Sequence, residues 1–367
     1  MIYKSSHSDF DIKRYPTSKN NSLKPWGSAD ELALNYVLDN TSLEDTIAIS
    51  NDSFGFLTTT LSNHKLNVIV NNKTQESSIL NNLQANGISK SEITFINPLE
   101  DIAKDYKMGI IKIPKGLNMF ELYLNQMHKN LSNDGVIICS FMTKYFTPQI
   151  LKIASIYFEE VEQSKALKKA RIIILSKKKE ISNQELIHSI SYKDEIIKQY
   201  YGVFSSNNID YATQFLIEAF KVDPSENMVL DLASGNGILA KEVLKQAPNS
   251  TVHLTDDSYV AIASSKLNLE NKNCNFHHVY NLDSFDDNQF NLVISNPPFH
   301  FEYETNISVP LGMFSQVARC LKSTGRFIMV ANRHLSYKKH LENRFSSVEI
   351  TSENDKFMVY ECFNPIK

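Results

Sequence analysis

The feature that most constrains the fold is an alternation of short apolar runs and longer amphipathic stretches. In the first half of the 367 residues, strands are expected at 46–50, 66–70, 93–96, 108–113, 136–139 and 170–175, and helices at 57–63, 75–85, 117–131 and 147–157. Strands that alternate with helices form parallel sheets covered on both faces. We therefore expect a doubly wound, mostly parallel α/β fold.

The second half repeats the first in the same order. The corresponding segments are 47–55 with 228–235, 68–72 with 253–257, 77–81 with 264–268, and 131–138 with 321–328. Collinear matches of this kind indicate two copies of one structural unit. We expect two tandem Rossmann-like domains, residues 1–185 and residues 195–367, joined by a polar connecting stretch at about 180–194.

The second copy carries a sequence pattern typical of nucleotide-like ligands. An apolar strand ends at Asp231 and leads through Gly235 and Gly237 into a helix. Asp256 follows about 20 residues later, at the end of the next strand, where a carboxylate can accept hydrogen bonds from ribose hydroxyls. A glycine turn alone is a weak signal, because any tight strand–helix turn can contain it.

The feature that sets this copy apart from a dehydrogenase is Asn296-Pro297-Pro298-Phe299-His300, directly after the apolar run 290–295. Ligands of open α/β sheets bind at the carboxyl ends of strands. Carbonyl oxygens at Asn296 and Pro297 can accept hydrogen bonds from a planar amino group, and Phe299 can stack on a flat base. His300 can relay a proton, although a surface turn is the commoner role for such a histidine.

The first copy lacks these ligand-binding features. Asn71 and Asn72 stand at its second strand end, and Lys112-Ile113-Pro114 stands where Asn-Pro-Pro-Phe is expected. We therefore expect a degenerate domain that packs against the substrate or grips it.

Composition places the chain among ordinary globular proteins, with 42% hydrophobic and 22% charged residues and a net charge of −3. No apolar run has membrane-spanning length, and the first residues do not form a signal peptide, which predicts a cytoplasmic protein. The scattered cysteines (Cys139, Cys274, Cys320 and Cys362) indicate buried thiols, with no metal site. Two basic stretches, one from Arg319 to the end and one at 165–179, are each more often solvated surfaces, but in a chain with the Asn-Pro-Pro-Phe motif they favour RNA.

Taken together, these residues resemble the ribosomal RNA guanine-N2 methyltransferases of the RlmG/RsmC type over nearly the whole chain. The motifs that carry the resemblance are Pro25-Trp26, Ala29-Asp30-Glu31, Gly202-Val203-Phe204-Ser205, the segments 231–237 and 296–300, and Val330-Ala331-Asn332-Arg333-His334-Leu335. The first and last of these resemble the large-subunit (23S rRNA) branch more than the small-subunit branch.

The resemblance implies a degenerate N-terminal domain that recognises RNA and a catalytic C-terminal class I methyltransferase domain. Such an enzyme uses S-adenosyl-L-methionine (AdoMet) to methylate the N2 amino group of one guanine in 23S rRNA, and a monomer is expected. The residues that match the family's cofactor site are Phe204, Ser205, Asp210, Thr213, Asp231, Gly235, Gly237, Asp256, Asn281 and Asn296. Those that match its target-base motif are Asn296, Pro297, Pro298 and Phe299.

One departure from the family pattern concerns the turn, where Ala233-Ser234 replaces Gly-Cys. A Cβ atom at position 233 is unfavourable if the backbone there has a positive φ, which would weaken AdoMet binding. Two other interpretations therefore remain. One is an amino methyltransferase acting on small-subunit rRNA guanine, adenine or a glutamine amide. The other is an RNA-binding protein without catalytic activity.

Overall fold

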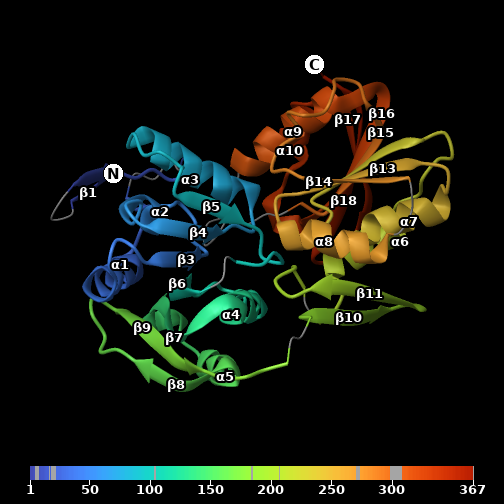
Figure 1. Cartoon of the computed structure of the whole chain (residues 1–367). Coiled ribbons are helices and arrows are strands. Elements are labelled where there is room, and N and C mark those ends of the chain that lie inside the picture. Colours follow the sequence, from blue (N-terminus) through green and yellow to red (C-terminus); the bar gives the residue numbers. More distant parts are fainter. Residues whose placement is uncertain are drawn as a thin grey trace. The chain divides into compact units, whose positions relative to one another are not determined.

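A computed structural model describes residues 1–4, 8–15, 17, 22–102, 105–182, 185–205, 207–269, 273–297 and 308–366, the last range without the side chains of 308–311. The chain divides into two compact units, Met1–Leu186 and Ile187–Lys367 (Figure 1). Each unit is built around one sheet and is described by itself below.

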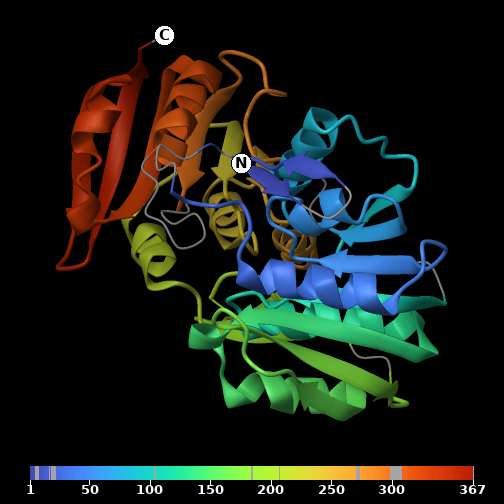
Figure 2. The ribbon, with the colours of Figure 1, turned by 90° about the vertical axis from the view of Figure 1, so that its left-hand side faces the viewer.

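The first unit contains a seven-stranded sheet with the order β5-β4-β3-β6-β7-β9-β8. Helix α1 packs along β7 and β9, as the blue helix and green strands of Figure 2 show. The elements of this unit are β1 (Ile2–Lys4), β2 (Asp9–Asp11), α1 (Ser28–Asn40), β3 (Thr46–Ser50), α2 (Phe56–Thr60), β4 (Lys65–Ile69), α3 (Lys73–Ala85), β5 (Ile93–Ile96), β6 (Tyr106–Lys112), α4 (Leu117–Asn130), β7 (Leu131–Met142), η1 (Thr143–Tyr145), α5 (Pro148–Tyr157), β8 (Phe158–Gln163) and β9 (Ala170–Lys178).

The second unit contains a seven-stranded sheet with the order β14-β13-β12-β15-β16-β18-β17. Its elements are β10 (Ile187–Tyr192), β11 (Glu195–Tyr200), α6 (Tyr211–Ala219), β12 (Met228–Leu232), α7 (Ile238–Gln246), β13 (Thr251–Asp256), α8 (Tyr259–Asn268), β14 (Cys274–His278), β15 (Phe290–Ser295), α9 (Ser308–Cys320), β16 (Leu321–Asn332), η2 (Arg333–Leu335), α10 (Lys338–Glu342), β17 (Phe345–Glu353) and β18 (Phe357–Pro365).

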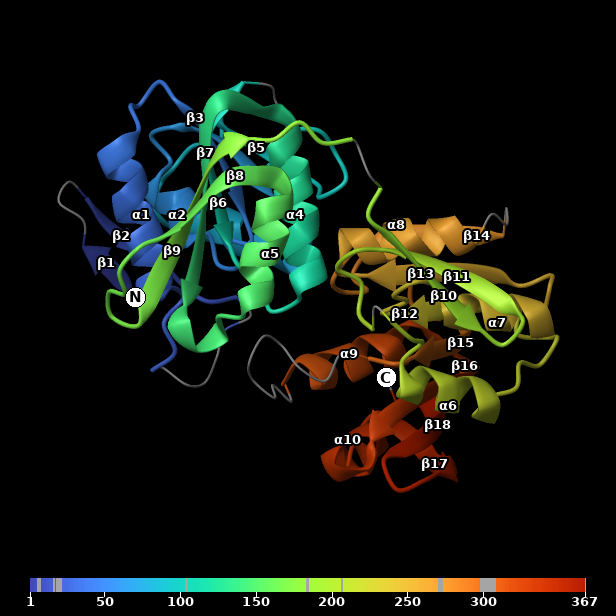
Figure 3. The same ribbon diagram turned by 90° about the horizontal axis from the view of Figure 1, so that it is seen from below.

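The two sheets have the same topology. In each, the first five strands are parallel and the last two run antiparallel to their neighbours. Helices cover both faces; in the first unit, α1 and α2 lie on one side and α4 and α5 on the other (Figure 3). Neighbouring residues of the central strand β12 enter different hydrophobic clusters, Val229 on one face and Leu230 on the other. This confirms the predicted fold class of two tandem doubly wound domains.

The strand register corrects the expected correspondence between the copies. Ile47 pairs with Met108 in the first sheet as Val229 pairs with Leu292 in the second. Counting forward from these pairs makes Gly55 the counterpart of Gly237, and both are left-handed N-caps with φ of 77° and 80°. The match of 47–55 with 228–235 was therefore wrong by two residues at its glycine.

The same register shifts two other matches by one residue and confirms the last. Asn82 on α3, rather than Asn81, corresponds to Asn268 on α8, and each donates a hydrogen bond to a backbone oxygen of its own glycine turn. In the segment 68–72, Val68 corresponds to Leu254 rather than to His253. The match of 131–138 with 321–328 holds, because β7 and β16 begin at Leu131 and Leu321.

The expected polar connection at 180–194 is partly a strand. Strand β10 pairs antiparallel with β11 in a separate two-stranded sheet that begins the second unit. The hairpin lies along α8 (Figure 3), where the Tyr200 N–H donates to Ser264 Oγ at 2.9 Å and the Lys198 N–H donates to Asn268 Oδ1 at 2.8 Å. The polar residues that looked like a linker are therefore the exposed positions of a hairpin.

All four cysteines are free thiols; Cys139, Cys320 and Cys362 are buried and Cys274 is partly exposed. Among the described helices, none has the length and apolarity needed to cross a membrane.

A buried ion-pair network ties three segments of the second unit together. Arg326 on β16 donates from Nε to Glu226 Oε1 at 2.6 Å and from Nη2 to Glu226 Oε2 at 2.8 Å. It also contacts Glu361 on β18, and its Nη2 reaches the Lys221 carbonyl at 2.6 Å. The three side chains are 18%, 11% and 15% exposed.

Replacing Arg326 should therefore destabilise the second unit strongly. Arg326→Ala leaves two mostly buried carboxylates without a cation, which costs about 3–5 kcal/mol of unfolding free energy. The control is Arg333→Ala, because the Arg333–Glu353 pair spans 3.9 Å and is half exposed, so its loss costs about 0–1 kcal/mol. Urea unfolding measures both; equal costs would contradict this assignment.

Candidate active site

The turn from β12 into α7 begins with a fully buried carboxylate. Asp231 is 0% exposed. Its Oδ2 accepts the N–H of Ala240 in the first turn of α7 at 2.9 Å, which satisfies one of the unpaired amides of a helix start. Within the described part of the chain, its Oδ1 has no hydrogen-bond partner. A buried oxygen of this kind is ready to accept from a ligand or water.

Three residues of this turn have a positive φ: Ala233 (59°), Gly235 (56°) and Gly237 (80°). A Cβ on Gly237 would lie 2.9 Å from Leu269 Cδ1 and 3.2 Å from Ser265 on α8, at a φ of 80° that other residues rarely adopt. Among the residues that the structure describes, a Cβ on Gly235 would meet nothing within 4 Å. The backbone at Gly235 therefore faces open space through which a ligand can approach closely.

The second predicted carboxylate is hydrogen-bonded to the same turn. Asp256 ends β13, and its Oδ2 accepts the Gly235 N–H at 3.0 Å while its Oδ1 accepts the Ser258 N–H at 2.8 Å. Burial raises the pKa of Asp231 to about 7 and that of Asp256 to about 6. Asp256 accepts two backbone N–H groups whereas Asp231 accepts one, which accords with the higher pKa of Asp231.

The third part of the site lies at the end of β15. The Asn296 Nδ2 group donates to Asp210 Oδ2 at 2.9 Å and to Thr213 Oγ1 at 2.8 Å. Asp210 also caps α6, accepting from the backbone N–H groups of Ala212 and Thr213. Both amide protons of Asn296 are thus engaged, and because a carboxylate only accepts, the amide orientation is fixed. Asn296 Oδ1 is left as an acceptor on a rigid support.

Backbone pairing brings these parts to one edge of the sheet. In the register, β12 residue Asp231 lies opposite Ile294, and Leu232 lies opposite Ser295. Ser295 Oγ also donates to the Leu232 carbonyl at 2.6 Å. The carboxyl ends of β12, β13 and β15 therefore place Asp231, Asp256 and Asn296 on adjacent strands.

Other predicted residues have local roles in the structure. Phe204 is 77% exposed, and Ser205 has a φ of 59° with its Oγ donating to the Asn208 carbonyl at 2.6 Å. Asn281 Nδ2 donates to Asp283 Oδ2 at 2.6 Å within its own turn. Pro297 is buried, whereas Pro298, Phe299 and His300 lie outside the described residues.

Sequence reasoning missed a polar brace behind the glycine turn. The fully buried Gln199 on β11 accepts from Asn236 Nδ2 at 2.8 Å and donates to the Ser205 carbonyl at 3.2 Å. Ser265 Oγ donates to the Gly235 carbonyl at 2.9 Å, and Asn268 Nδ2 to the Asn236 carbonyl at 2.9 Å. The available signal was the run of polar residues at helical spacing on one face of α8.

The first unit fills the same positions with different chemistry. The strand register makes Ile49 the counterpart of Asp231 and Val70 that of Asp256. Lys112 takes the place of Asn296, as expected, and forms an ion pair with the buried Asp30 at 3.1 Å. Asp30 is the third residue of α1 as Thr213 is of α6. An internal salt bridge therefore occupies the corner where the second unit presents an acceptor.

Trp26 contributes to this packed corner of the first unit. It is 8% exposed, its ring stacks on Phe56 with centroids 5.3 Å apart, and its Nε1 donates to Glu31 at 3.0 Å. These contacts place it in the core rather than on a base-stacking surface.

The raised pKa of Asp231 predicts an unusual pH dependence of stability. The native state keeps a proton that the unfolded chain releases near pH 4, so unfolding free energy falls as pH rises from about 4 to about 7, by up to about 1.4 kcal/mol per pH unit. Asp231→Asn should reduce this slope to the part that the raised pKa of Asp256 contributes below about pH 6. The control is the exposed Asp223, whose pKa is lowered by hydrogen bonds from Ser225; Asp223→Asn should not flatten it. Thermal unfolding at several pH values tests both.

The left-handed backbone at Ala233 predicts a gain from glycine. Removing the Cβ there relieves about 1 kcal/mol of strain, which offsets the greater flexibility of glycine in the unfolded chain. Ala233→Gly should be neutral or stabilising and should bind AdoMet at least as tightly. In contrast, Ala263→Gly within α8 should cost about 1 kcal/mol. A clear loss of melting temperature in Ala233→Gly would show that the alanine is unstrained.

Comparison with known proteins covers both units. The RLMG N-terminal domain model matches residues 2–180, and the Methyltransferase small domain model matches residues 194–361. Ribosomal RNA large subunit methyltransferase G of Yersinia pseudotuberculosis is 30% identical over 367 residues, covering 95% of this chain and 91% of the relative. The protein of that name from Psychromonas ingrahamii is 29% identical over 364 residues, covering 95% of both.

The tandem fold also matches a solved structure. The 16S rRNA N2 methyltransferase RsmC of T. thermophilus, in complex with AdoMet and guanosine, aligns over 99% of this chain and 97% of its own, with a TM-score of 0.78 and 18% identity. At that identity the likeness concerns the fold. The sequence relatives, the two matched domain models and the shared architecture agree with one another. The chain therefore belongs to the RlmG family of AdoMet-dependent ribosomal RNA methyltransferases.

Proposed function

We propose that this chain methylates the N2 amino group of one guanine in 23S ribosomal RNA. The observation that carries the proposal is the fixed Asn296 amide, whose Nδ2 protons are held by Asp210 and Thr213 while Oδ1 is left to accept. The relatives are named as large-subunit methyltransferases, which supports 23S rRNA, and the structural neighbour is named as an N2 methyltransferase, which supports guanine N2.

The residues of the β12 turn fit a nucleoside-like cofactor. Among the described residues, Asp231 keeps a buried oxygen without a partner and the backbone at Gly235 is open, while Asp256 is partly exposed at the next strand end. We propose that these residues, with Gly237, hold AdoMet, and that Phe204, Ser205, Asp210 and Thr213 fold over it, with Asn281 near its adenine. When bound, AdoMet supplies a methyl group on a sulfonium centre.

The chain's own residues would hold the substrate amino group so that its nitrogen, the methyl carbon and the sulfur lie in one line. The N2 lone pair of guanine is delocalised, and positive charge grows on nitrogen as the new bond forms. Asn296 Oδ1 and the Pro297 carbonyl accept the N–H groups and stabilise that charge, while the rigid Asp210–Asn296–Thr213 hydrogen bonds keep the acceptor in position. In this proposal Phe299 would stack on the extruded base. Pro298 would restrict the backbone beside it.

The two units have separate roles in this proposal. Residues 195–367 form the catalytic domain. Residues 1–185 form a methyltransferase-like domain that is degenerate, because Ile49, Val70 and Lys112 replace the groups proposed to bind ligands in the second unit. We propose that this domain recognises the RNA.

Cofactor binding and methyl transfer can be separated by mutation. In calorimetry, Asp256→Asn should lose AdoMet affinity, whereas the neighbouring Asp257→Asn should keep it. Asn296→Ala should weaken AdoMet binding less than Asp256→Asn does, but should lower kcat at saturating AdoMet by about 10²–10³, since it removes an acceptor used in the transition state.

The product identifies the substrate. Transfer from labelled AdoMet to unmethylated 23S rRNA, followed by digestion to nucleosides, should yield N2-methylguanosine. A methylated adenosine, or transfer only to 16S rRNA, would replace guanine N2 of 23S rRNA as the target. Wild-type protein that binds no AdoMet and transfers no methyl group to either rRNA would favour a non-catalytic RNA-binding role.

A further inference from the structure

A tight turn on the first unit presents several lysines together. The turn joins β8 to β9, and Leu167 and Ala170 exchange backbone hydrogen bonds of 2.9 Å across Lys168 and Lys169. The η1 segment lies against it, because the Thr143 N–H and Oγ1 donate to the Lys169 carbonyl at 2.9 and 3.2 Å. We define the lysine patch as the side chains of these two segments, Lys144, Lys165, Lys168 and Lys169.

The patch is exposed and poorly neutralised. All four lysines are exposed. Lys168 lies 3.7 Å from Glu31 and remains 71% exposed, and across the described ranges no carboxylate forms an ion pair with the other three. In contrast, Lys177 on the same hairpin is paired with Glu160 at 2.5 Å. The patch therefore carries charge that the fold itself does not use.

The backbone conformation of the turn is one that lysine disfavours, which indicates that the two lysines are kept for a purpose other than folding. Lys168 and Lys169 have φ values of 48° and 63°, so both central residues of a two-residue hairpin turn are left-handed. Such turns strongly favour Asn-Gly, and a side chain with a Cβ costs free energy there. Residues that oppose the local backbone preference commonly serve a function.

The second unit shows that the charge is not required by the architecture. Its corresponding turn, between β17 and β18, contains Asn354, Asp355 and Lys356 after Glu353. The same hairpin is thus compatible with two carboxylates and one ammonium. The patch belongs to the first unit alone.

Exposed apolar groups accompany the lysines. Tyr145 is 42% exposed with Lys144 Nζ 4.6 Å from its ring centroid, and Leu167 is 55% exposed. Ammonium groups beside an accessible aromatic ring suit a single-stranded nucleic acid, whose phosphates bind the cations while a base stacks on the ring. An acidic peptide would use the charge without needing the ring.

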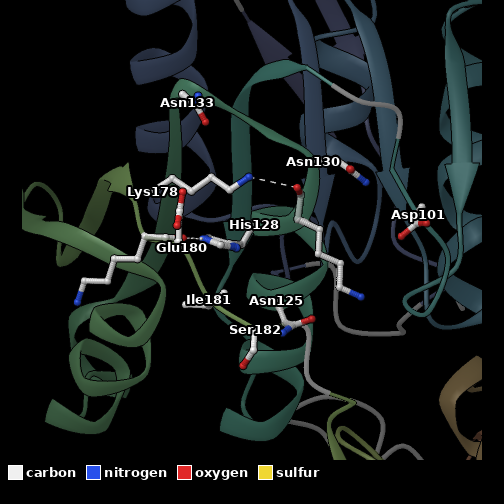
Figure 4. Close-up of a pocket in the computed structure, with 11 residues that line it drawn as sticks. Asp101, Asn125, His128, Asn130, Asn133, Lys178, Glu180, Ile181 and Ser182 are labelled. Carbon is white, nitrogen blue, oxygen red and sulfur yellow. Dashed lines mark hydrogen bonds between the residues drawn. The ribbon is translucent and has the colours of Figure 1, made fainter.

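Another basic group of this unit is used internally. A pocket of this unit is lined by the basic side chains Lys129, Lys178 and Lys179 and by His128 (Figure 4). However, Lys178 Nζ donates to the carbonyls of Lys129 and Leu131 at 3.1 Å, and Lys179 Nζ donates to the Ser155 carbonyl at 2.7 Å. The ammonium groups of Lys178 and Lys179 therefore already have partners within the fold, at carbonyls near the ends of α4 and α5.

We propose that the lysine patch binds the phosphate backbone of the RNA substrate. This inference rests on the proposed function, which supplies an RNA partner, and adds the surface of the first unit that contacts it. Because phosphate contacts are independent of base sequence, the patch should strengthen binding of any single-stranded RNA and lower the KM for rRNA without changing kcat.

The turn itself offers a substitution that removes charge while improving the backbone. Lys168→Asn/Lys169→Gly installs the preferred residues for this turn, so the melting temperature should be kept or raised. Binding of fluorescein-labelled poly(U) to the full chain should weaken roughly tenfold, and the slope of log affinity against log salt should fall by about 1.4, as expected for two lost phosphate contacts. AdoMet binding should be unchanged.

The matched control removes two lysines from the opposite edge of the same sheet. Lys65 and Lys90 are exposed near the starts of β4 and β5, and Lys65→Asn/Lys90→Asn should retain both affinity and salt slope. An unchanged slope in the turn variant would overturn the patch and leave the proposed methylation standing. A wild-type chain that neither binds poly(U) nor methylates rRNA would overturn both. Poly-L-glutamate that binds more tightly than poly(U) at equal charge, and loses that affinity in the turn variant, would assign the patch to an acidic protein instead.

Discussion

The constraint on which the rest of the molecule depends is the parallel pairing of the central strands. Parallel strands end at a common edge, so every residue that follows a strand lies beside the residues that follow its neighbours. In the second unit this places Asp231, Asp256 and Asn296 on adjacent strands although they are distant in sequence. The hydrogen bonds from Gly235 to Asp256 and from Asn296 to Asp210 then fix the side chains within this backbone frame.

The duplicated frame separates what the fold requires from what the chemistry requires. Both copies keep a left-handed glycine at the helix start, Gly55 and Gly237, and an α-helix asparagine that braces the turn. These features serve the backbone. In the first copy Ile49 and Val70 stand in place of the two carboxylates, and the buried Asp52 accepts the helix N–H of Thr58 as Asp231 accepts that of Ala240. The Lys112–Asp30 pair, with Asp30 1% exposed, closes the corner that Asn296 occupies in the second copy.

Much of this arrangement could be predicted from the sequence because apolar runs mark buried strands and motifs mark their ends. The strand ends at Asp231, Asp256 and Asn296 were found this way. The β10–β11 hairpin was missed because its buried residues, such as Ile190 and Ile197, are separated by polar ones. Gly55 was matched with Gly235 because both are glycines that follow a strand. The hydrogen-bonded strand register instead makes Gly237 its counterpart. Gln199 could not be found, since its partners Asn236 and Ser205 come from different segments.

The second unit keeps several features that oppose its own stability. Asp231 is buried, with one oxygen that has no partner in the described ranges, and Ala233 has a left-handed backbone that a Cβ disfavours. Neither is needed to build the sheet, because the first copy places the buried apolar Ile49 and the left-handed Asn51 at these positions. Ligands of such sheets bind at strand ends, and a ligand that binds the native state stabilises it. Residues that lower stability at a strand end are therefore expected in a binding site. At the β12 turn this cost coincides with the open backbone at Gly235 and the fixed Asn296 acceptor.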